Sequence, residues 1–284
     1  MQRSTFLTND GAQLSYASWP ARQADAQPVV MLHSLFFGAD MFDAVVPRLG
    51  GDYAVLAVDH RGQGASSAGA QPASMLRLAQ DTIALIEARV GGPAHVVGSS
   101  MGGYVALQMA ALRPDLLRTL TLSCCTAHAE RQPERFDALE AALREQGPAR
   151  LVDTLMATMF SEHFMQQGDA QARARWRAHF AALPRSVADA VHGVFSRPGY
   201  EPLLPGLDMP VLLCSGQGDR AKRPEDMQYI ADRVAGSRHV TFERAGHTPP
   251  VEDPARFAAE LLRFWRASAR VPGEGAARPL APNS

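Results

Sequence analysis

The chain has 284 residues, of which 46% are hydrophobic and 20% are charged, and its formal net charge is −1. This is the profile of an ordinary globular protein, and the lack of a basic excess argues against a nucleic-acid partner or an acidic membrane surface. Three cysteines, two of them adjacent, make a poor disulfide framework and favour a reducing compartment. Since the N-terminal stretch holds no apolar signal core, we expect a cytoplasmic protein with no membrane partner.

Short apolar runs alternate with helical patterns along the chain. The segment 4–19, with Asp10-Gly11 at its centre, predicts an antiparallel hairpin. We expect strands at 28–32, 53–58, 94–97, 117–122, 211–214 and 238–242, and helices near 74–90, 102–112, 225–235 and 254–268. Near-continuous apolar runs are typical of strands buried on both faces. The alternation therefore predicts an α/β fold with a mostly parallel, twisted sheet flanked by helices.

The alternation stops between about Cys125 and Pro210. This stretch shows helical patterns near 133–146, 148–160, 169–182 and 184–196, and we interpret it as a helical cap inserted between two strands. The predicted organisation is an α/β core of residues 1–125 and 206–270 with a cap of residues 126–205. Residues 271–284, rich in Pro, Gly and Ala, are predicted to form a flexible C-terminal tail.

The segment Gly98-Ser99-Ser100-Met101-Gly102 stands between an apolar run and a helical pattern. Gly-x-Ser-x-Gly at a strand-to-helix turn predicts a nucleophilic serine, Ser100. A serine needs a base and a group that orients the base. We predict His247, between the last strand and the last helix, as the base, and Asp219, just after the preceding strand, as the acid. The order Ser, Asp, His along the chain is the order known for nucleophiles on such turns.

Acyl transfer also needs hydrogen-bond donors for the oxyanion. We expect these to be the backbone N–H groups of Met101, which follows the nucleophile, and Leu35, in the loop after the first long strand. Phe36 is the alternative to Leu35.

These motifs resemble those of the α/β-hydrolase superfamily over residues 4–268. The matching segments are Leu32-His33 with the loop to Gly38, then Asp59–Ser66, Gly98–Gly102, Gly216–Asp219, and Gly246-His247 with Glu252-Asp253-Pro254. The resemblance implies the α/β-hydrolase fold and architectural roles for Asp59 and Arg61. The chain is also similar to the 3-oxoadipate enol-lactonase-like esterases and lactonases in the pair Ser34-Leu35, the segments 61–67 and 99–103, and the size of the cap. One departure is Ser34, where many members have Gly.

The resemblance implies an ester or lactone hydrolase that uses neither a metal nor an organic cofactor. We expect the substrate to be small and largely apolar, because Phe36 and Phe37 stand beside the predicted oxyanion hole. Met156, Phe160 and Trp176 of the cap are predicted to bind it too. Enol-lactonases bind a free carboxylate, and the cap offers basic residues at Arg150, Arg173, Arg175, Arg177, Arg185 and Arg197. Each of these six is more typical of a solvated helix surface.

Other functions remain open at this point. A C–C bond hydrolase or an acyltransferase would use the same triad, and a small-molecule receptor would use the same fold without catalysis. A haloalkane dehalogenase would need Asp in place of Ser100. The sequence leaves open whether the chain is a monomer or a homodimer.

Overall fold

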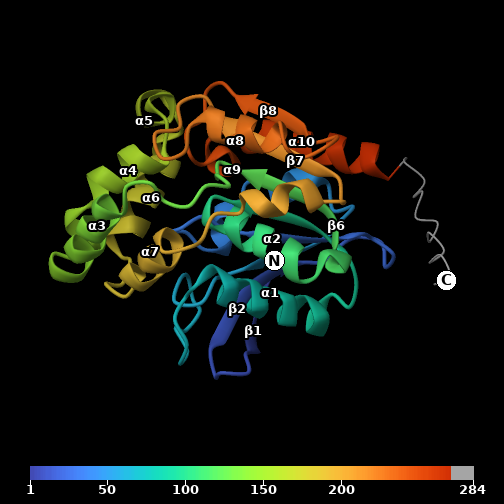
Figure 1. The fold of residues 1–284 in the computed structure, drawn as a ribbon, viewed down its shortest axis with the longest axis horizontal. Helices are drawn as coiled ribbons and strands as arrows, with labels where there is room; N and C mark the ends of the chain where they lie inside the picture. Colours follow the sequence, from blue (N-terminus) through green and yellow to red (C-terminus); the bar gives the residue numbers. More distant parts are fainter. Residues whose placement is uncertain (270–284) are drawn as a thin grey trace, which may run out of the picture.

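The computed structural model describes residues 1–269, so the predicted tail at 271–284 lies outside the described residues. An eight-stranded sheet runs through the middle of the molecule in the order β1-β2-β4-β3-β5-β6-β7-β8 (Figure 1). The strands are β1 (Gln2–Leu7), β2 (Gln13–Trp19), β3 (Pro28–Leu32), β4 (Ala54–Val58), β5 (Ala94–Ser99), β6 (Leu117–Ser123), β7 (Val211–Gly216) and β8 (Arg238–Phe242). The pairs β1–β2 and β2–β4 are antiparallel, and every pair from β4–β3 to β7–β8 is parallel. The predicted α/β class with a mostly parallel sheet is confirmed.

Helices flank this sheet at the places where the sequence predicts them. They are α1 (Met75–Arg89), α2 (Met101–Leu112), α8 (Pro224–Ala231) and α10 (Pro254–Ser268), and a short helix α9 (Pro249–Glu252) precedes α10. Side chains fix two of the starts, because Ser74 accepts a hydrogen bond from the Arg77 N–H and Asp253 accepts one from the Arg256 N–H. Among the described residues, no helix is both long enough and apolar enough to cross a membrane.

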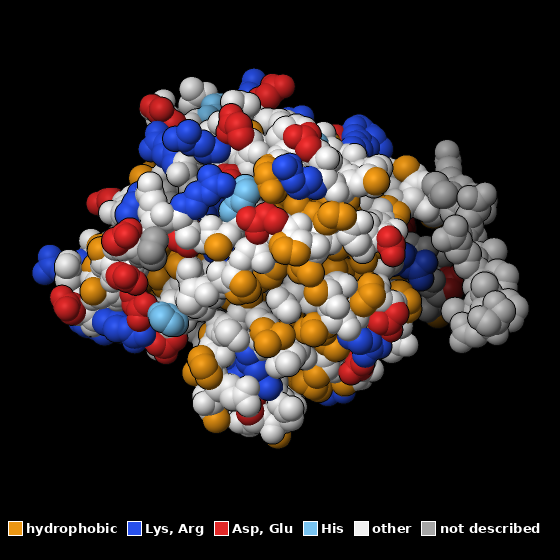
Figure 2. Space-filling model, in the orientation of Figure 1, with side chains coloured by type: hydrophobic (Ala, Val, Ile, Leu, Met, Phe, Trp, Pro, Cys, Tyr) orange, Lys and Arg blue, Asp and Glu red, His pale blue; other side chains and the backbone are white. Residues whose placement is uncertain are grey.

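Five α-helices lie between β6 and β7, and we call the segment 126–205 that holds them the cap. They are α3 (Pro133–Glu145), α4 (Val152–Met159), α5 (Glu162–Gln167), α6 (Ala170–Ala181) and α7 (Val187–Phe195), on the left in Figure 1. The sequence patterns predict only four helices here. They miss α5 because its six residues are too few to show a helical period. Figure 2 shows both signs of charge interspersed over the cap surface.

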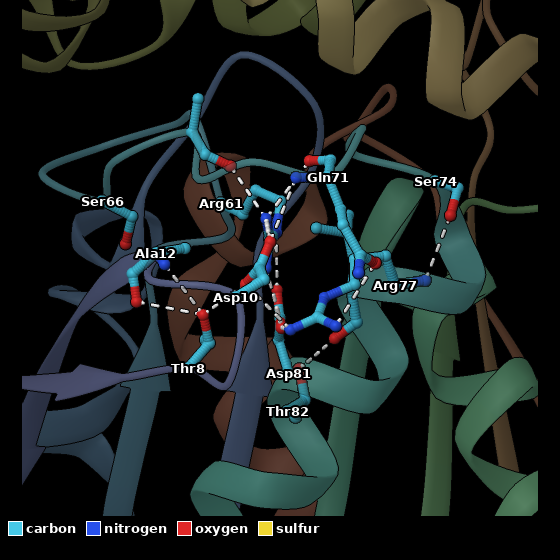
Figure 3. A network of polar contacts seen from close by, with 12 residues as sticks. Thr8, Asp10, Ala12, Arg61, Ser66, Gln71, Ser74, Arg77, Asp81 and Thr82 are labelled. Carbon is cyan, nitrogen blue, oxygen red and sulfur yellow. Dashed lines mark hydrogen bonds and ion pairs between the residues drawn. The ribbon is translucent and has the colours of Figure 1, made fainter.

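A buried ionic network connects the N-terminal hairpin to the sheet and to α1 (Figure 3). Arg61 donates to Asp81 through Nε and Nη2, at 2.8 and 3.0 Å, and to Asp10 through Nη1 and Nη2, at 2.7 and 2.8 Å. Arg77 lies 2.8 Å from Asp81 and 3.1 Å from Asp10. Two arginines and two aspartates therefore neutralise one another with almost no exposure to water. The network fixes the loop after β4.

We expect Asp81→Asn to lower the free energy of unfolding by about 3 kcal/mol, because it leaves two buried guanidinium groups with one carboxylate. Urea unfolding measures the change. The matched control is Glu87→Gln on the same helix, since Glu87 forms an exposed pair with Arg113 and should contribute less than about 1 kcal/mol. Equal losses in the two variants would contradict a special role for the network.

Candidate active site

Ser100 occupies a strained turn between β5 and α2. Its backbone has φ 49° and ψ −107°, which a non-glycine residue adopts only when its surroundings enforce it. The flanking glycines allow the turn to close. A Cβ on Gly98 would lie 2.3 Å from the Gly102 carbonyl oxygen, and one on Gly102 would lie 2.1 Å from the Leu32 oxygen. The turn thereby holds the hydroxyl at the carboxyl end of the sheet, where open α/β sheets bind ligands.

Ser100, His247 and Asp219 form a continuous hydrogen-bonded chain. The Ser100 Oγ lies 2.7 Å from His247 Nε2, and His247 Nδ1 lies 2.8 Å from Asp219 Oδ2. A carboxylate can only accept, so Nδ1 carries the proton and Nε2 is free to accept the proton of the serine. All three residues are buried, with 3 to 7% of their surface exposed. The structure thus brings together the three residues that the sequence predicts for the site.

Glu252 fixes the loop that carries His247. Its Oε1 accepts the N–H groups of Gly246 and Thr248, the two neighbours of His247, at 2.9 and 3.1 Å. Its Oε2 accepts the N–H of Ser161 in the cap at 2.8 Å. Burial raises the pKa of this carboxyl group. One side chain therefore holds His247 on both sides and joins its loop to the cap. Sequence reasoning noted Glu252 only as part of a family motif.

The predicted oxyanion donors are available for a ligand. Within residues 1–269, neither the Leu35 N–H nor the Met101 N–H has an acceptor. The alternative donor, the Phe36 N–H, is engaged by the Gln63 side-chain oxygen at 3.0 Å. This favours Leu35 over Phe36. Gln63 had no role in the sequence analysis, and nothing in the local pattern indicated one.

The side chains of His33 and His179 hold the loop that carries Leu35. His33 Nδ1 donates to the Ser34 carbonyl at 2.7 Å, and His33 Nε2 accepts the His60 N–H at 2.9 Å. This bonding requires a neutral ring, and burial lowers the pKa of His33 accordingly. From the cap, His179 Nε2 donates to the Phe36 carbonyl at 2.8 Å. The loop is thus hydrogen-bonded to the core through His60 and to the cap through His179.

A cavity of about 460 Å³ opens onto Ser100 and His247. Its walls come from the loop that carries Leu35, α2, the cap helices α3, α4 and α7, and the loops after β7 and β8. The lining residues are Leu35, Phe36, Ser100, Tyr104, Arg135, Phe136, Leu139, Thr154, Leu155, Ala157, Thr158, Met159, Val194, Phe195, Arg220, Ala221, Lys222 and His247. Of the five predicted substrate-binding residues, only Phe36 is among them.

The other four, Phe37, Met156, Phe160 and Trp176, are buried and do not line this cavity. The Phe37 ring centre lies 4.8 Å from that of Trp176 and 6.2 Å from that of Phe160, so these rings pack on one another. They anchor the cap. Hydrophobic patterning marks a side chain as buried, but it does not distinguish an anchoring cluster from a cavity wall.

Cys124 completes a group of possible metal ligands with Asp219 and His247, whose donor atoms all lie within 4.8 Å of one another. Burial and the nearby Asp219 raise the pKa of the Cys124 thiol well above its ordinary value. Asp219 and His247 are bonded to each other, so two of the three donor sets in this group are already engaged.

The chain belongs to the alpha/beta hydrolase family, whose model matches residues 29–260. It is 30% identical over 244 residues to a pimeloyl-[acyl-carrier protein] methyl ester esterase of Neisseria meningitidis, covering 83% of this chain and 92% of that protein. It is 26% identical over 265 residues to 3-oxoadipate enol-lactonase 2 of Acinetobacter baylyi, covering 88% and 92%.

An esterase and an enol-lactonase are also among the solved structures that are similar to this chain. A thermophilic esterase from Thermogutta terrifontis superposes with a TM-score of 0.86 at 26% identity, covering 94% of this chain and 99% of that one. The enol-lactonase from Burkholderia xenovorans LB400 gives a TM-score of 0.86 at 25% identity, covering 93% and 100%. The resemblance to α/β-hydrolases, including enol-lactonases, is confirmed.

We expect Glu252→Ala to slow fluorophosphonate labelling of Ser100 by about 100-fold, because displacing a catalytic group by about 1 Å has an effect of this size. Glu252→Gln should slow labelling much less, since its amide oxygen can still accept from Gly246 and Thr248. The control is Glu260→Ala, which removes a buried glutamate that pairs with Arg238 and Arg263 outside the site. If labelling follows only the folded fraction in all three variants, Glu252 does not position the base.

Proposed function

We propose that this protein is a serine hydrolase that cleaves a carboxylic ester or lactone of a small, largely apolar substrate through an acyl-enzyme. The observation that carries the proposal is the bonded chain from Asp219 through His247 to the Ser100 hydroxyl, with Ser100 and His247 on the wall of a cavity. The esterase and lactonase names of the relatives support the same reaction class.

In the first half-reaction, His247 Nε2 takes the Ser100 proton while Oγ attacks the carbonyl carbon of the substrate. The N–H groups of Leu35 and Met101 hold the resulting oxyanion, and each such donor contributes about 3 kcal/mol of transition-state stabilisation. Asp219 stabilises the imidazolium through Nδ1. The tetrahedral intermediate then collapses, and His247 Nε2 delivers the proton to the departing alkoxide oxygen.

In the second half-reaction, a water molecule replaces the alcohol. His247 takes a proton from this water, the hydroxide attacks the acyl carbon, and the same two N–H groups hold the second oxyanion. Collapse returns the proton to Ser100 and releases the carboxylic acid. Every step uses protein groups and water alone.

The apolar part of the cavity suits the carbon skeleton of such a substrate. Phe136, Leu139, Leu155, Val194 and Phe195 contribute aromatic and aliphatic wall from the cap. A cavity of about 460 Å³ lies in the usual range for small-molecule sites. We infer that the length of the acyl chain is selected by these cap side chains.

We expect Ser100→Ala to lower turnover by about 10⁴- to 10⁶-fold, because losing the nucleophile disables the whole triad. The assay is a panel of p-nitrophenyl esters and lactones of graded acyl length. Ser99→Ala is the matched control, since it deletes a neighbouring buried hydroxyl that has no hydrogen-bond partner in the described residues. Near-normal turnover of Ser100→Ala would refute this mechanism. A protein that neither hydrolyses the panel nor labels with a fluorophosphonate would instead be a receptor.

A further inference from the structure

The charged residues that line the catalytic cavity all carry the same sign. They are Arg135 from α3, together with Arg220 and Lys222 from the loop after β7, and the lining contains neither Asp nor Glu. The rest of the wall is apolar or carries a hydroxyl, apart from the catalytic histidine. An uncharged ester would make no use of these cations. We propose that the substrate carries a carboxylate beside its scissile ester or lactone, and that Lys222 binds that carboxylate.

Lys222 is placed by the same carboxylate that orients the base. Asp219 Oδ1 accepts the N–H groups of Ala221 and Lys222 at 2.8 and 2.9 Å, while its Oδ2 bonds to His247. This turn fixes the backbone of Lys222 relative to the triad. The point at which the Lys222 side chain starts is therefore fixed relative to the nucleophile, and the contact of its ammonium group with Glu130 restricts the other end.

The three cationic side chains differ in their exposure to solvent. The Lys222 side chain is only 15% exposed, whereas that of Arg220 is 58% exposed, and Arg135 is also exposed. An inner ammonium in an apolar wall interacts with a carboxylate more strongly than a solvated one does, because water screens it less. The two outer guanidinium groups contribute a positive potential at the entrance, which attracts anions.

The existing partners of these cations leave them able to bind a ligand. Lys222 Nζ lies 3.4 Å from Glu130 Oε2, and an ammonium has three donors, so this contact uses only one of them. Arg220 meets Glu162 at 3.8 Å on the surface, where ion pairs are weak. Arg135 bonds to the neutral side chain of Gln132 at 3.2 Å and has no carboxylate partner among residues 1–269.

The six cap arginines that could have bound a carboxylate do not line this cavity. Arg175 pairs with Asp40 and Asp43, and Arg177 pairs with Asp153. Arg197 is buried against the Tyr104 ring and donates to two carbonyl oxygens. Two of the three basic residues at the site, Arg220 and Lys222, come from the loop after β7. The sequence signal for them was their position shortly after Asp219.

This inference rests on the proposed function, and a matched pair of substrates tests it. Monomethyl adipate carries a free carboxylate, and dimethyl adipate is the neutral counterpart with the same chain. We expect kcat/KM to favour the monomethyl ester by about 10- to 100-fold, the value of one hydrogen bond to a charged group. Suberate esters repeat the comparison with a longer chain.

Variants at two positions should move this ratio in opposite directions. Lys222→Met should lower the ratio of kcat/KM for the monomethyl ester to that for the dimethyl ester by about 10- to 100-fold, and Lys222→Arg should restore most of it. Glu130→Gln should raise the ratio, because it releases Lys222 from its carboxylate. The double variant Glu130→Gln/Lys222→Met covers the case in which Lys222→Met destabilises the fold by leaving Glu130 unpaired.

The control for lost surface charge is Arg223→Met, since Arg223 is exposed, follows Lys222 directly and does not line the cavity. It should leave the ratio unchanged. A wild-type ratio of one or less, or equal ratios for Lys222→Met and Arg223→Met, would overturn the carboxylate proposal while leaving the hydrolase intact.

Binding measurements separate this failure from failure of the hydrolase itself. Calorimetric titration of Ser100→Ala with the two esters reports recognition without turnover. Tighter binding of the monomethyl ester supports the anion site even if wild-type protein hydrolyses nothing. Equal binding of the two esters rejects the site whatever the reaction proves to be.

Discussion

The hydrogen bond between the Ser100 hydroxyl and His247 Nε2 joins residues 147 positions apart, and the architecture of the sheet makes it possible. Ser100 follows the end of β5, Asp219 follows β7 and His247 follows β8. These strands are parallel to their neighbours, so their carboxyl ends reach the same edge of the sheet. A few residues of loop beyond each end bring the side chains into contact. The loop that carries Leu35 reaches this edge in the same way, from β3.

Backbone strain is concentrated at this edge. The only non-glycine residues with positive φ in the described part of the chain are Phe36, Ser100 and Cys124. Phe36 belongs to the oxyanion loop, and Cys124 follows β6 next to Asp219 and His247. Such conformations cost about 1–3 kcal/mol each and persist only where the surroundings enforce them. Here the neighbouring strands do so: Ser100 N–H donates to the Ser123 carbonyl at 2.7 Å, and Cys124 N–H to the Cys214 carbonyl at 2.8 Å.

The sequence predicts the parts of this molecule that follow from local patterns. The buried strands show as apolar runs, and the strand-end positions of Ser100, Asp219 and His247 follow from the order of those runs. The short helix α5 leaves no period to detect. Phe37 and Trp176 could be predicted as buried, but only three-dimensional packing shows that they anchor the cap. Arg220 and Lys222 lie in a loop without periodicity, so their place on the cavity wall depends on the turn that Asp219 closes.

The two sources of the cavity wall suggest how selectivity is divided. The cap supplies most of the apolar surface, from helices that contribute no member of the triad, so those side chains can change while the chemistry stays intact. The loop after β7 supplies both Asp219 and Lys222, and one carboxylate bonds to the base and to the Lys222 backbone. On the proposal that the substrate is anionic, Asp219 therefore both orients His247 and holds the backbone of the residue that binds the charge. A substitution that moves Asp219 would disturb both at once, whereas the proposed selection for chain length rests on side chains of the cap.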